Sequence, residues 1–468
     1  MLLRFVFENV LSFKEETDFN LLPAKSLKSH NDHLLTVNNR IDVLKGAIIY
    51  GANGAGKSNM FKAVDQFKHC VLSGKIPSKL MYIRNRITEA SKPVQQSVEF
   101  CIGGRVYSYG MSFTEGLCIE EWLFDISTEK EKKIFERVYS NEKHRAELSF
   151  GKDFNQKEKN QLLVKLLEEN ILKDNELLIA HREIIKLPEL EDVYNWFDKH
   201  LVVIFPEIKS SSIFDDMYSN ERFKTFAEDI LRGLDLGVDG IEFKKETISE
   251  FLTEAPLVEA RQLEEMKKNI DEDKAGILDT SHFTASLAKE NGQYYVRRII
   301  TNHVADGKNY TFELKEESDG TQRLLDFIPM IKELDTADCT FFVDEINRSI
   351  HPNTMWDMMS KLMSGKSIGQ LVCSSHESNL LSCDIFRTDE IWFAEKRHED
   401  QSTVMYPLSD FKPRNDLDIR KGYLKGRFGA IPFLSKTDDL KWETEDSRTR
   451  VELYTRKKER LGIITFSS

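Results

Sequence analysis

The sequence lacks the features of a membrane or secreted protein. No run of about 18 apolar residues, the length that suggests a membrane-spanning helix, occurs in the chain. The N-terminus, MLLRFVFENVLSFKEE, becomes polar and acidic too early for a secretory signal. The six cysteines form no CxxC pair and no zinc-type spacing, which favours reduced thiols. We therefore expect a cytoplasmic protein that makes no contact with a membrane.

The chain also lacks an excess of positive charge. Its formal net charge is −12, so the surface as a whole does not attract nucleic acid. Any such contact would need a local basic patch, and residues 448–460 are rich in Arg and Lys. A solvated terminal helix or strand is the other interpretation of that segment, and both stay open.

One glycine-rich stretch fits the G-x-x-x-x-G-K-[ST] pattern of phosphate-binding loops. Its residues are Gly51, Ala52, Asn53, Gly54, Ala55, Gly56, Lys57 and Ser58. Residues 43–50 predict a strand before it, and the apolar spacing over residues 59–74 predicts a helix after it. Backbone N–H groups of the loop and of the helix start, Asn59 included, would face the phosphates. Lys57 would neutralise them, and Ser58 would bind Mg²⁺. The stretch therefore predicts ATP and Mg²⁺ as cofactors.

A second candidate lies far downstream, where the apolar residues 340–343 lead into two adjacent carboxylates, Asp344 and Glu345. In a Walker B element, Asp344 would hold Mg²⁺ through water and Glu345 would orient or deprotonate the attacking water. The apolar residues 369–375 predict another buried strand, which ends at His376. Ligands bind at the carboxyl ends of strands in open α/β sheets, so His376 is expected at the same site. A strand-end cap and an ordinary buried histidine are the alternatives.

The order of motifs resembles that of ABC-type ATPases of the SMC/RecF/OLD-like branch. ESDGTQR (residues 317–323) stands in the place of the LSGGQ signature, DEINRSIHP in that of Walker B with its D-loop, and SSHESNL in that of the switch histidine. FVFENVLSFKEE is similar to the first strand of that branch. KGYLKGRFGAIPFL, residues 421–434, is similar to a hallmark of RloA-like and PARIS-type ATPases of bacterial anti-phage defence. The fold class implied is an α/β, ABC-type P-loop ATPase head with a mixed sheet, an antiparallel β subdomain and a helical insertion.

The resemblance also implies how ATP is held. Each nucleotide would be closed between the phosphate loop of one protomer and the signature of another, which requires a homodimer or a higher oligomer of dimers. Ser318 and the Gly320 amide would donate to the γ-phosphate, and the helix beginning near Thr321 and Gln322 would direct its N-terminus at it. His376 would contact the γ-phosphate or the attacking water. A plain helix N-cap is the alternative for Ser318.

Two departures from the family pattern concern the signature and the Q-loop. Glu317 and Asp319 stand where the consensus has Leu and Gly, which places acids beside the triphosphate and predicts slow turnover. Gln95 and Gln96, ahead of an apolar run, are candidates for the Q-loop; surface polar residues are the alternative.

The domain boundaries follow from these motifs. Residues 1–150 form a front lobe with the phosphate loop and alternating, strand-like segments, and residues 296–433 form a back lobe. Residues 151–295 are highly charged with helical spacing and without sustained heptads, which predicts a compact helical arm or lid. Its charged faces are either solvated or used for partner docking or oligomerisation. Residues 434–468 are a tail.

No second active site is visible, since the chain has no HNH motif, zinc cluster or nucleophile motif. We therefore expect a slowly hydrolysing ATPase that acts as sensor and scaffold in abortive-infection defence. It would respond to a phage-encoded trigger protein and control a separate Toprim-type nuclease. The alternative is a RecF/Rad50-like, DNA-binding ATPase of DNA repair.

Overall fold

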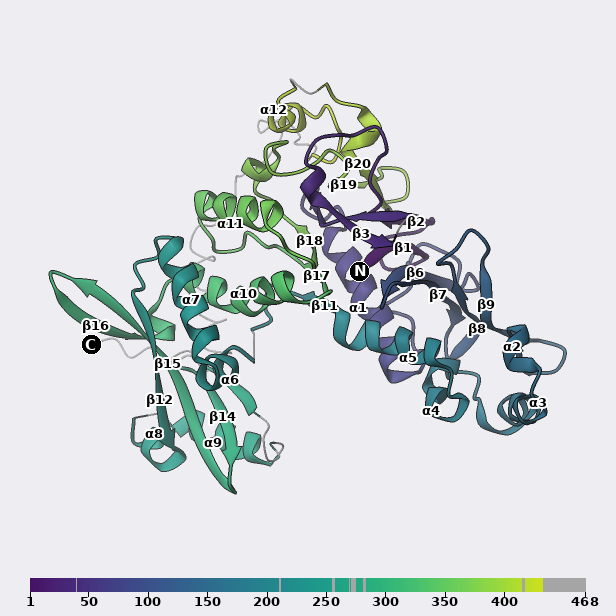
Figure 1. Ribbon diagram of the computed structural model, residues 1–468, viewed down its shortest axis with the longest axis horizontal. Helices are drawn as coiled ribbons and strands as arrows, with labels where there is room; N and C mark the ends of the chain where they lie inside the picture. The colour runs from purple at the N-terminus through teal and green to yellow at the C-terminus, as the bar shows by residue number, and fades with distance from the viewer. Residues whose placement is uncertain are drawn as a thin grey trace, which may run out of the picture. The chain divides into compact units, whose positions relative to one another are not determined.

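The computed structural model describes residues 1–431 except 39, 210–211, 255–256, 269, 271–274, 281–282 and 415–416 (Figure 1). The predicted tail, residues 434–468, and the end of the 421–434 segment lie outside the described residues. Among the described helices, none is long and apolar enough to cross a bilayer.

A six-stranded mixed sheet forms the centre of the fold. Its order is β11-β17-β18-β5-β19-β20, with every neighbouring pair parallel except β19 and β20. The strands are β11 (Leu201–Ile204), β17 (Thr340–Val343), β18 (Gln370–Ser374), β5 (Gly46–Tyr50), β19 (Ile391–Lys396) and β20 (Thr403–Pro407). Strands β5, β17 and β18 are buried along their whole length, which explains their continuous apolar sequences.

Helices cover both faces of this sheet. Ile49 packs on one face in a core shared with helix α1 (Lys57–Ser73). Ile48 packs on the other face with α10 (Asp319–Thr336) and α11 (Pro352–Ser364). Successive residues of a strand point to opposite faces, so one short strand connects two cores. Because β5, β17 and β18 are parallel neighbours, the loops that follow them meet at one edge of the sheet. These loops carry the phosphate loop, the Walker B carboxylates and His376.

The predicted antiparallel subdomain is confirmed as a seven-stranded sheet of order β10-β9-β8-β7-β6-β1-β2. Its strands are β1 (Leu2–Glu8), β2 (Thr17–Asn20), β6 (Val94–Ile102), β7 (Arg105–Thr114), β8 (Leu117–Asp125), β9 (Lys132–Ser140) and β10 (Arg145–Phe150). Gly103 and Gly104 both have positive φ, as a two-residue hairpin turn between β6 and β7 requires. The sheet packs on α1 in the same core as Ile49. A mixed sheet joined to an antiparallel β subdomain is the fold class that the sequence predicts.

The predicted helical insertion is wrong in two places. Residues 201–204 are β11, an edge strand of the central sheet rather than part of a helical arm. Further on, the chain forms a five-stranded sheet of order β12-β15-β14-β13, with β16 beside β15, which a purely helical arm does not include. Its strands are β12 (Gly240–Thr247), β13 (Ala275–Asp279), β14 (Thr284–Glu290), β15 (Gln293–Ala305) and β16 (Lys308–Glu313). The boundary drawn at residue 295 falls inside β15.

The insertion also contains helices, as the helical character of its sequence predicts. They include α3 (Glu158–Leu166), α4 (Arg182–Ile185), α5 (Pro188–Asn195), α7 (Glu221–Gly233) and α9 (Leu257–Lys267), with α6 (Ser212–Ser219) and α8 (Ile248–Glu254) between. Helix α10 contacts two cores: Leu324 packs toward the central sheet, and Leu325 packs with α7 and the five-stranded sheet. The insertion is therefore coupled through packing to the helix that follows the signature segment.

Candidate functional site

The phosphate loop connects β5 to α1, and side chains of Ser12 and Thr403 pack against it. Gly54 and Gly56 have φ values of 78° and 104°, in the left-handed region that favours glycine. A Cβ on Gly56 would lie 2.1 Å from Thr403 Oγ1 and 2.8 Å from Ser12 Oγ. Thr403 in turn donates to the Ala55 carbonyl at 2.8 Å. Only glycine fits at position 56, as the loop pattern predicts.

Lys57 folds back onto its own loop. Its Nζ donates to the carbonyls of Gly51 at 2.8 Å and Ala52 at 3.2 Å, and the residue is 5% exposed. Burial lowers the pKa of Lys57 to about 8, against the opposing effect of Asp344 and Glu345. The amine is therefore positive at neutral pH and positioned to exchange loop carbonyls for phosphate oxygens.

Both Walker B carboxylates stand at the end of β17, and β18 fixes them. Asp344 is 3% exposed and accepts a hydrogen bond from Ser374 Oγ at 2.5 Å. The same hydroxyl accepts from the Glu345 backbone N–H at 2.8 Å. Glu345 has φ of 50°, a strained conformation for a residue with a side chain. Such strain is common at functional sites, and here it sets the direction of the Glu345 carboxylate.

His376 follows β18 at the same edge, and the D-loop positions its backbone. Asn347 Oδ1 accepts from the His376 N–H at 3.3 Å and from Ser375 Oγ at 3.0 Å. Burial, with a smaller contribution from Lys57, lowers the pKa of His376. The imidazole is therefore neutral at physiological pH and can accept a proton or a hydrogen bond.

One cavity of about 420 Å³, here called the phosphate-loop cavity, collects the predicted residues. Its lining consists of Asn53, Gly54, Ala55, Gly56, Lys57, Ser58, Asn59, Glu345 and His376. Three segments far apart in the sequence thus meet at one point, and Asp344 lies next to Glu345 on the same strand end. This volume lies within the range of about 300–1,000 Å³ for ligand pockets. A loop with a lysine, a helix N-terminus and two nearby carboxylates fits a nucleotide phosphate with Mg²⁺.

The signature segment, residues 317–323, is not part of the described lining of the phosphate-loop cavity. Ser318 caps α10, where its Oγ accepts from the Thr321 N–H at 3.1 Å. A Cβ on Gly320 would lie 2.6 Å from the Ser349 carbonyl oxygen, so the helix start is packed against the D-loop. A separate cavity of about 270 Å³, the signature cavity, is lined by Pro206, Glu207, Ile208, Lys209, Asp319, Gln322, Arg323, Asp326, Arg348 and Ser349. Ser318, Gly320, Thr321 and Gln322 are not among the residues that line the phosphate-loop cavity within the described chain.

The two acids of the signature have different surroundings. The Glu317 carboxylate contacts His303 Nε2 at 2.6 Å and accepts from the Thr301 hydroxyl, and both partners belong to β15. Asp319 lines the signature cavity. Of the two acids expected beside a triphosphate, Glu317 is instead tied to β15, 14 and 16 residues earlier in the chain, a pairing that the sequence pattern does not predict.

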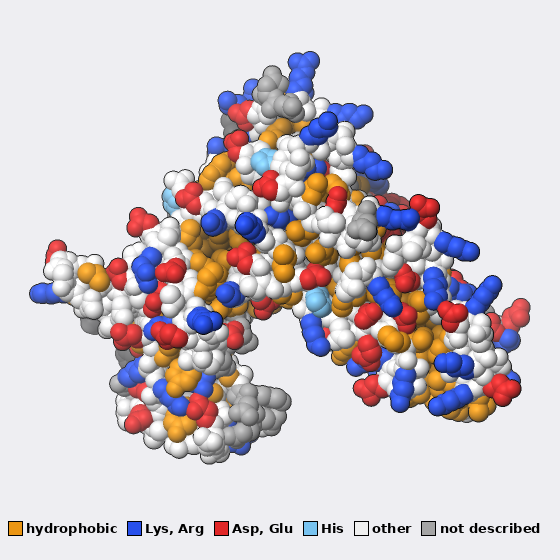
Figure 2. Space-filling model, in the orientation of Figure 1, with side chains coloured by type: hydrophobic (Ala, Val, Ile, Leu, Met, Phe, Trp, Pro, Cys, Tyr) orange, Lys and Arg blue, Asp and Glu red, His pale blue; other side chains and the backbone are white. Residues whose placement is uncertain are grey.

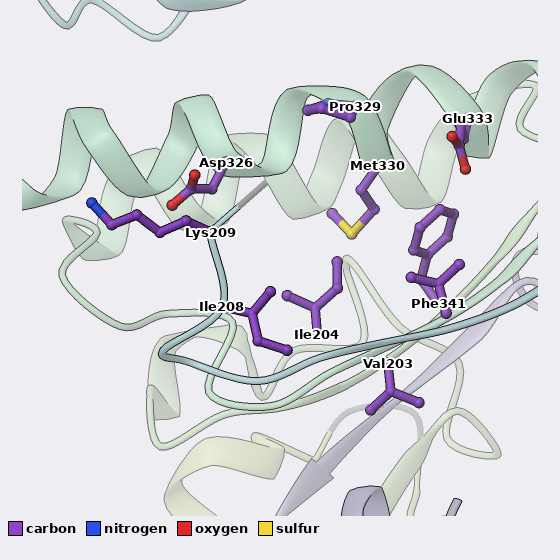
Figure 3. A pocket seen from close by; sticks show the side chains of 10 residues that line it. Val203, Ile204, Ile208, Lys209, Asp326, Pro329, Met330, Glu333 and Phe341 are labelled. Atoms are coloured by element: carbon purple, nitrogen blue, oxygen red, sulfur yellow. The ribbon is translucent and has the colours of Figure 1, made fainter. Parts of the chain in front are cut away.

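A third cavity, of about 280 Å³, lies between β11 and α10 (Figure 3). Ile204, Met330 and Phe341 approach one another there, and Pro329 interrupts the hydrogen bonding inside α10. Lys209 and Asp326 lie at its other end. The helix that carries the signature is thus incompletely packed against the edge of the central sheet.

The Q-loop candidates are not at the site. Gln96 is fully buried and donates from Nε2 to the Ala63 carbonyl of α1 at 2.9 Å, while Gln95 lies beside it in β6. Neither lines the phosphate-loop cavity among the residues described. The loop after β11 is better placed, because the Ile204 carbonyl accepts from the Asp344 N–H at 2.9 Å. Nothing in the sequence pattern indicates β11 or Thr403. Ser12 lies in FVFENVLSFKEE and Ser374 begins SSHESNL, but neither motif predicts the contacts that these hydroxyls make.

Comparisons with solved structures find SMC heads. They include an SMC head bound to the C-terminal winged-helix domain of ScpA, at 11% identity and TM-score 0.41, covering 88% of this chain and 99% of that one. The SMC head domain from Thermotoga maritima is 9% identical with TM-score 0.37, covering 87% and 98%. An SMC head with an extended coiled coil, bound to the C-terminal domain of ScpA from Pyrococcus furiosus, is 12% identical with TM-score 0.39, covering 88% and 97%. No curated protein matches the chain.

A family model matches residues 47–382, most of the chain, from β5 to the segment after His376. The match spans the phosphate loop, the whole insertion, the signature, Walker B and the histidine. The chain belongs to the family described as "AAA domain, putative AbiEii toxin, Type IV TA system".

Proposed function

We propose that the protein is an ABC-type ATPase that binds ATP with Mg²⁺ and hydrolyses it slowly at sites shared between two chains. The observation that carries this proposal is the division of the motifs. The phosphate loop, Glu345 and His376 line one cavity, and the signature residues Ser318 and Gly320 lie away from it. A second chain would bring its signature to the open side of the cavity, giving a homodimer or a higher oligomer of dimers.

Each residue of the cavity then has a role that its surroundings support. Lys57 leaves the carbonyls of its loop and neutralises the β- and γ-phosphates. Ser58 and Asp344 hold Mg²⁺, which when bound would offset the charge of the phosphates. Glu345 orients the attacking water, and neutral His376 accepts a hydrogen bond from that water or donates one to the γ-phosphate.

Slow turnover is part of the proposal. In the closed state the partner's signature would bring Asp319 near the triphosphate, where a carboxylate opposes the negative charge of the transition state. Glu317 would be less able to do so because its carboxylate is already hydrogen-bonded to His303 and Thr301 of β15. ATP would then serve mainly to hold the closed assembly.

The biological role we infer is that of a sensor and scaffold in anti-phage, abortive-infection defence in the cytoplasm. The family description, with its reference to a toxin of a toxin–antitoxin system, supports a role in controlled toxicity. The described residues show one cavity with nucleotide-type residues and no second hydrolytic centre was predicted, so a separate effector of Toprim-nuclease type is proposed. A phage-encoded protein would be the trigger. Charges of both signs are interspersed over the face in Figure 2, which favours protein partners over extended nucleic acid.

Phosphate release measured against protein concentration tests the enzymatic proposal. If sites form only between chains, the rate per chain rises with concentration and then saturates. A rate per chain that stays constant down to concentrations at which sedimentation shows monomers would contradict shared sites.

The defence role is tested by expressing the chain with and without its neighbouring gene. Toxicity that needs both genes supports the sensor proposal. ATP hydrolysis stimulated by duplex DNA, with a steep dependence on salt, would instead support the DNA-repair alternative.

A further inference from the structure

A short turn on the far side of the central sheet gathers two histidines and an aspartate. His30, Asp32 and His33 belong to one turn of 3₁₀ helix, Asn31–His33, with His30 as its cap. One ligand-type atom from each side chain lies within 4.8 Å of those of the other two. We call residues 30–33 the histidine turn. It lies outside the phosphate-loop cavity and plays no part in the proposed ATPase site.

Both imidazoles have one nitrogen committed to a hydrogen-bond acceptor. His30 Nε2 lies 2.7 Å from the Cys383 carbonyl oxygen, and His33 Nδ1 lies 2.9 Å from Glu390 Oε2. A carbonyl or a carboxylate accepts, so these nitrogens carry the protons. The other nitrogen of each ring, Nδ1 of His30 and Nε2 of His33, then has a lone pair. This is how metal-binding histidines are oriented, with the second nitrogen donating to a carboxylate or a carbonyl.

His33 is buried and hydrogen-bonded to a buried carboxylate. His33 is 2% exposed, and Glu390 is fully buried against it. Arg387 supports that carboxylate by donating its backbone N–H to Glu390 Oε2 at 2.8 Å, and it fixes the histidine turn by donating from Nη1 to the Ser29 carbonyl at 2.6 Å. Asp32 is exposed, so water reaches the cluster on its side.

We propose that the histidine turn binds one divalent transition-metal ion, with Zn²⁺ the best match. Its ligands are His30 Nδ1, the Asp32 carboxylate and His33 Nε2, with water in the fourth position. Two imidazoles and a carboxylate suit Zn²⁺, whose bonds of about 2.0–2.2 Å require the side chains to close by roughly 1 Å. The Asp32 carboxylate would offset part of the charge of the ion.

The position of the site gives it a structural role. The Glu390 carbonyl accepts from the Ile48 N–H at 2.8 Å, just where β19 begins beside β5. This is the amino-terminal edge of the parallel sheet, opposite the edge that carries the phosphate loop. The ion would bind only residues 30–33, and by fixing the two imidazoles it would strengthen their hydrogen bonds to Cys383 and Glu390, more than 300 residues further along the chain.

Metal titration of the tag-free full-length protein tests the proposal. After chelator treatment, Zn²⁺ is added in competition with a chromophoric chelator, and Co²⁺ absorption reports the coordination. We expect one Zn²⁺ per chain, a Co²⁺ d–d band typical of a low-coordinate site with nitrogen ligands, and a rise in Tm with Zn²⁺. His30→Ala and Asp32→Asn, at exposed or half-buried positions, should lose this binding while keeping the metal-free Tm. Failure of the wild type to bind one equivalent, or unchanged binding in both variants, would overturn the proposal.

Two further variants test whether the ion is bound at the histidine turn and not elsewhere in the chain. Glu390→Gln should weaken Zn²⁺ binding by about 10–100-fold, as expected for loss of a carboxylate that orients a ligand. His144→Asn, in the exposed turn between β9 and β10, is the matched control and should bind as the wild type does. Asp344→Asn, which removes a proposed Mg²⁺ ligand, should also leave Zn²⁺ binding intact; loss of binding in that variant would place the metal at the phosphate-loop cavity and contradict the proposal.

Discussion

The phosphate-loop cavity and the signature cavity differ in what they lack. The first has Lys57, the proposed Mg²⁺ ligand Ser58, Glu345 and His376, but neither Ser318 nor Gly320, the predicted signature donors, is among the described residues that line it. The second is lined by charged side chains next to the signature helix and has no phosphate loop. In the proposed function each cavity is half of a shared site, and a second chain would complete the enclosure of the triphosphate.

The largest expected effect on ATP binding comes from removing the Lys57 amine from the phosphate-loop cavity. Lys57→Ala should weaken ATP binding by about 1,000-fold, because a buried charge that meets phosphate is worth several kcal/mol. Fluorescent-nucleotide titration measures this. Lys62→Ala, on an exposed position of the same helix, is the control and should bind normally. Near-normal affinity in Lys57→Ala would show that the phosphate loop is not the nucleotide site.

Glu345→Gln should separate binding from hydrolysis within the same cavity. Loss of the water-orienting carboxylate is expected to lower kcat by about 100-fold or more, with ATP affinity unchanged or tighter. The variant should also hold the closed assembly, which size-exclusion chromatography with ATP detects. If phosphate release continued at the wild-type rate, another group would be the base.

Gly320→Ala should disturb the second cavity while sparing the first. The added Cβ would meet the Ser349 carbonyl at 2.6 Å, and such overpacking costs about 1–3 kcal/mol, or roughly 5–100-fold in closure. We expect lower hydrolysis with ATP binding per chain within about twofold. Gly233→Ala, where a Cβ meets nothing within 4 Å, is the matched control. Equal losses of binding and hydrolysis would contradict the division between the two cavities.

The pH dependence of ATP binding sharpens the assignment of Lys57. Because burial lowers its pKa to about 8, binding above that pH requires proton uptake, so affinity should fall by up to about tenfold per pH unit between pH 8 and 9. The free energy of unfolding of the ATP-free protein should change with pH in the opposite direction. The charged amine is a cost below pH 8, and that cost is relieved as pH rises from 8 toward the ordinary value of 10.5. Lys57→Arg, which stays charged, should show a flat pH profile whatever its affinity.

The phosphate loop, Asp344, Glu345 and His376 were predictable because each stands at the end of a buried, continuous apolar strand. Such strands can be recognised from the local sequence. Because ligands bind at the carboxyl ends of strands in open α/β sheets, the residues at these ends can be predicted as site residues. The supporting contacts were not predictable. Ser12 and Thr403 meet behind Gly56 from opposite ends of the chain, and only the folded sheet brings them together.

The insertion was misjudged because its charges are not all on the surface. Arg298 is 2% exposed, with Nη2 at 2.6 Å from Glu246 and Nη1 at 2.7 Å from Glu313. The three residues come from the neighbouring strands β12, β15 and β16, and only Glu246 falls within residues 151–295. The predicted boundary at residue 295 separates this buried carboxylate from the arginine that pairs with it. Strand β11 was missed for a related reason: its four residues pair with β17, far along the chain.

The structure also explains why the segment beginning at residue 421 is rich in glycine and aromatic residues. Tyr423 and Phe428 both stack on Phe393 of β19, and Gly422 has its Cβ position against the Phe428 ring at 2.7 Å. Its glycines and aromatics therefore serve packing against the central sheet. The resemblance to the RloA-like and PARIS-type group remains a prediction.

Mixing two inactive variants tests shared sites most directly. Lys57→Ala lacks a working phosphate loop, and Ser318→Arg blocks the signature while leaving ATP binding to each chain intact. If sites are shared, an equal mixture should recover about a quarter of wild-type hydrolysis, since half of randomly formed dimers contain one intact site of two. Hydrolysis by Ser318→Arg alone at the wild-type rate, or a mixture no more active than its two components, would contradict shared sites.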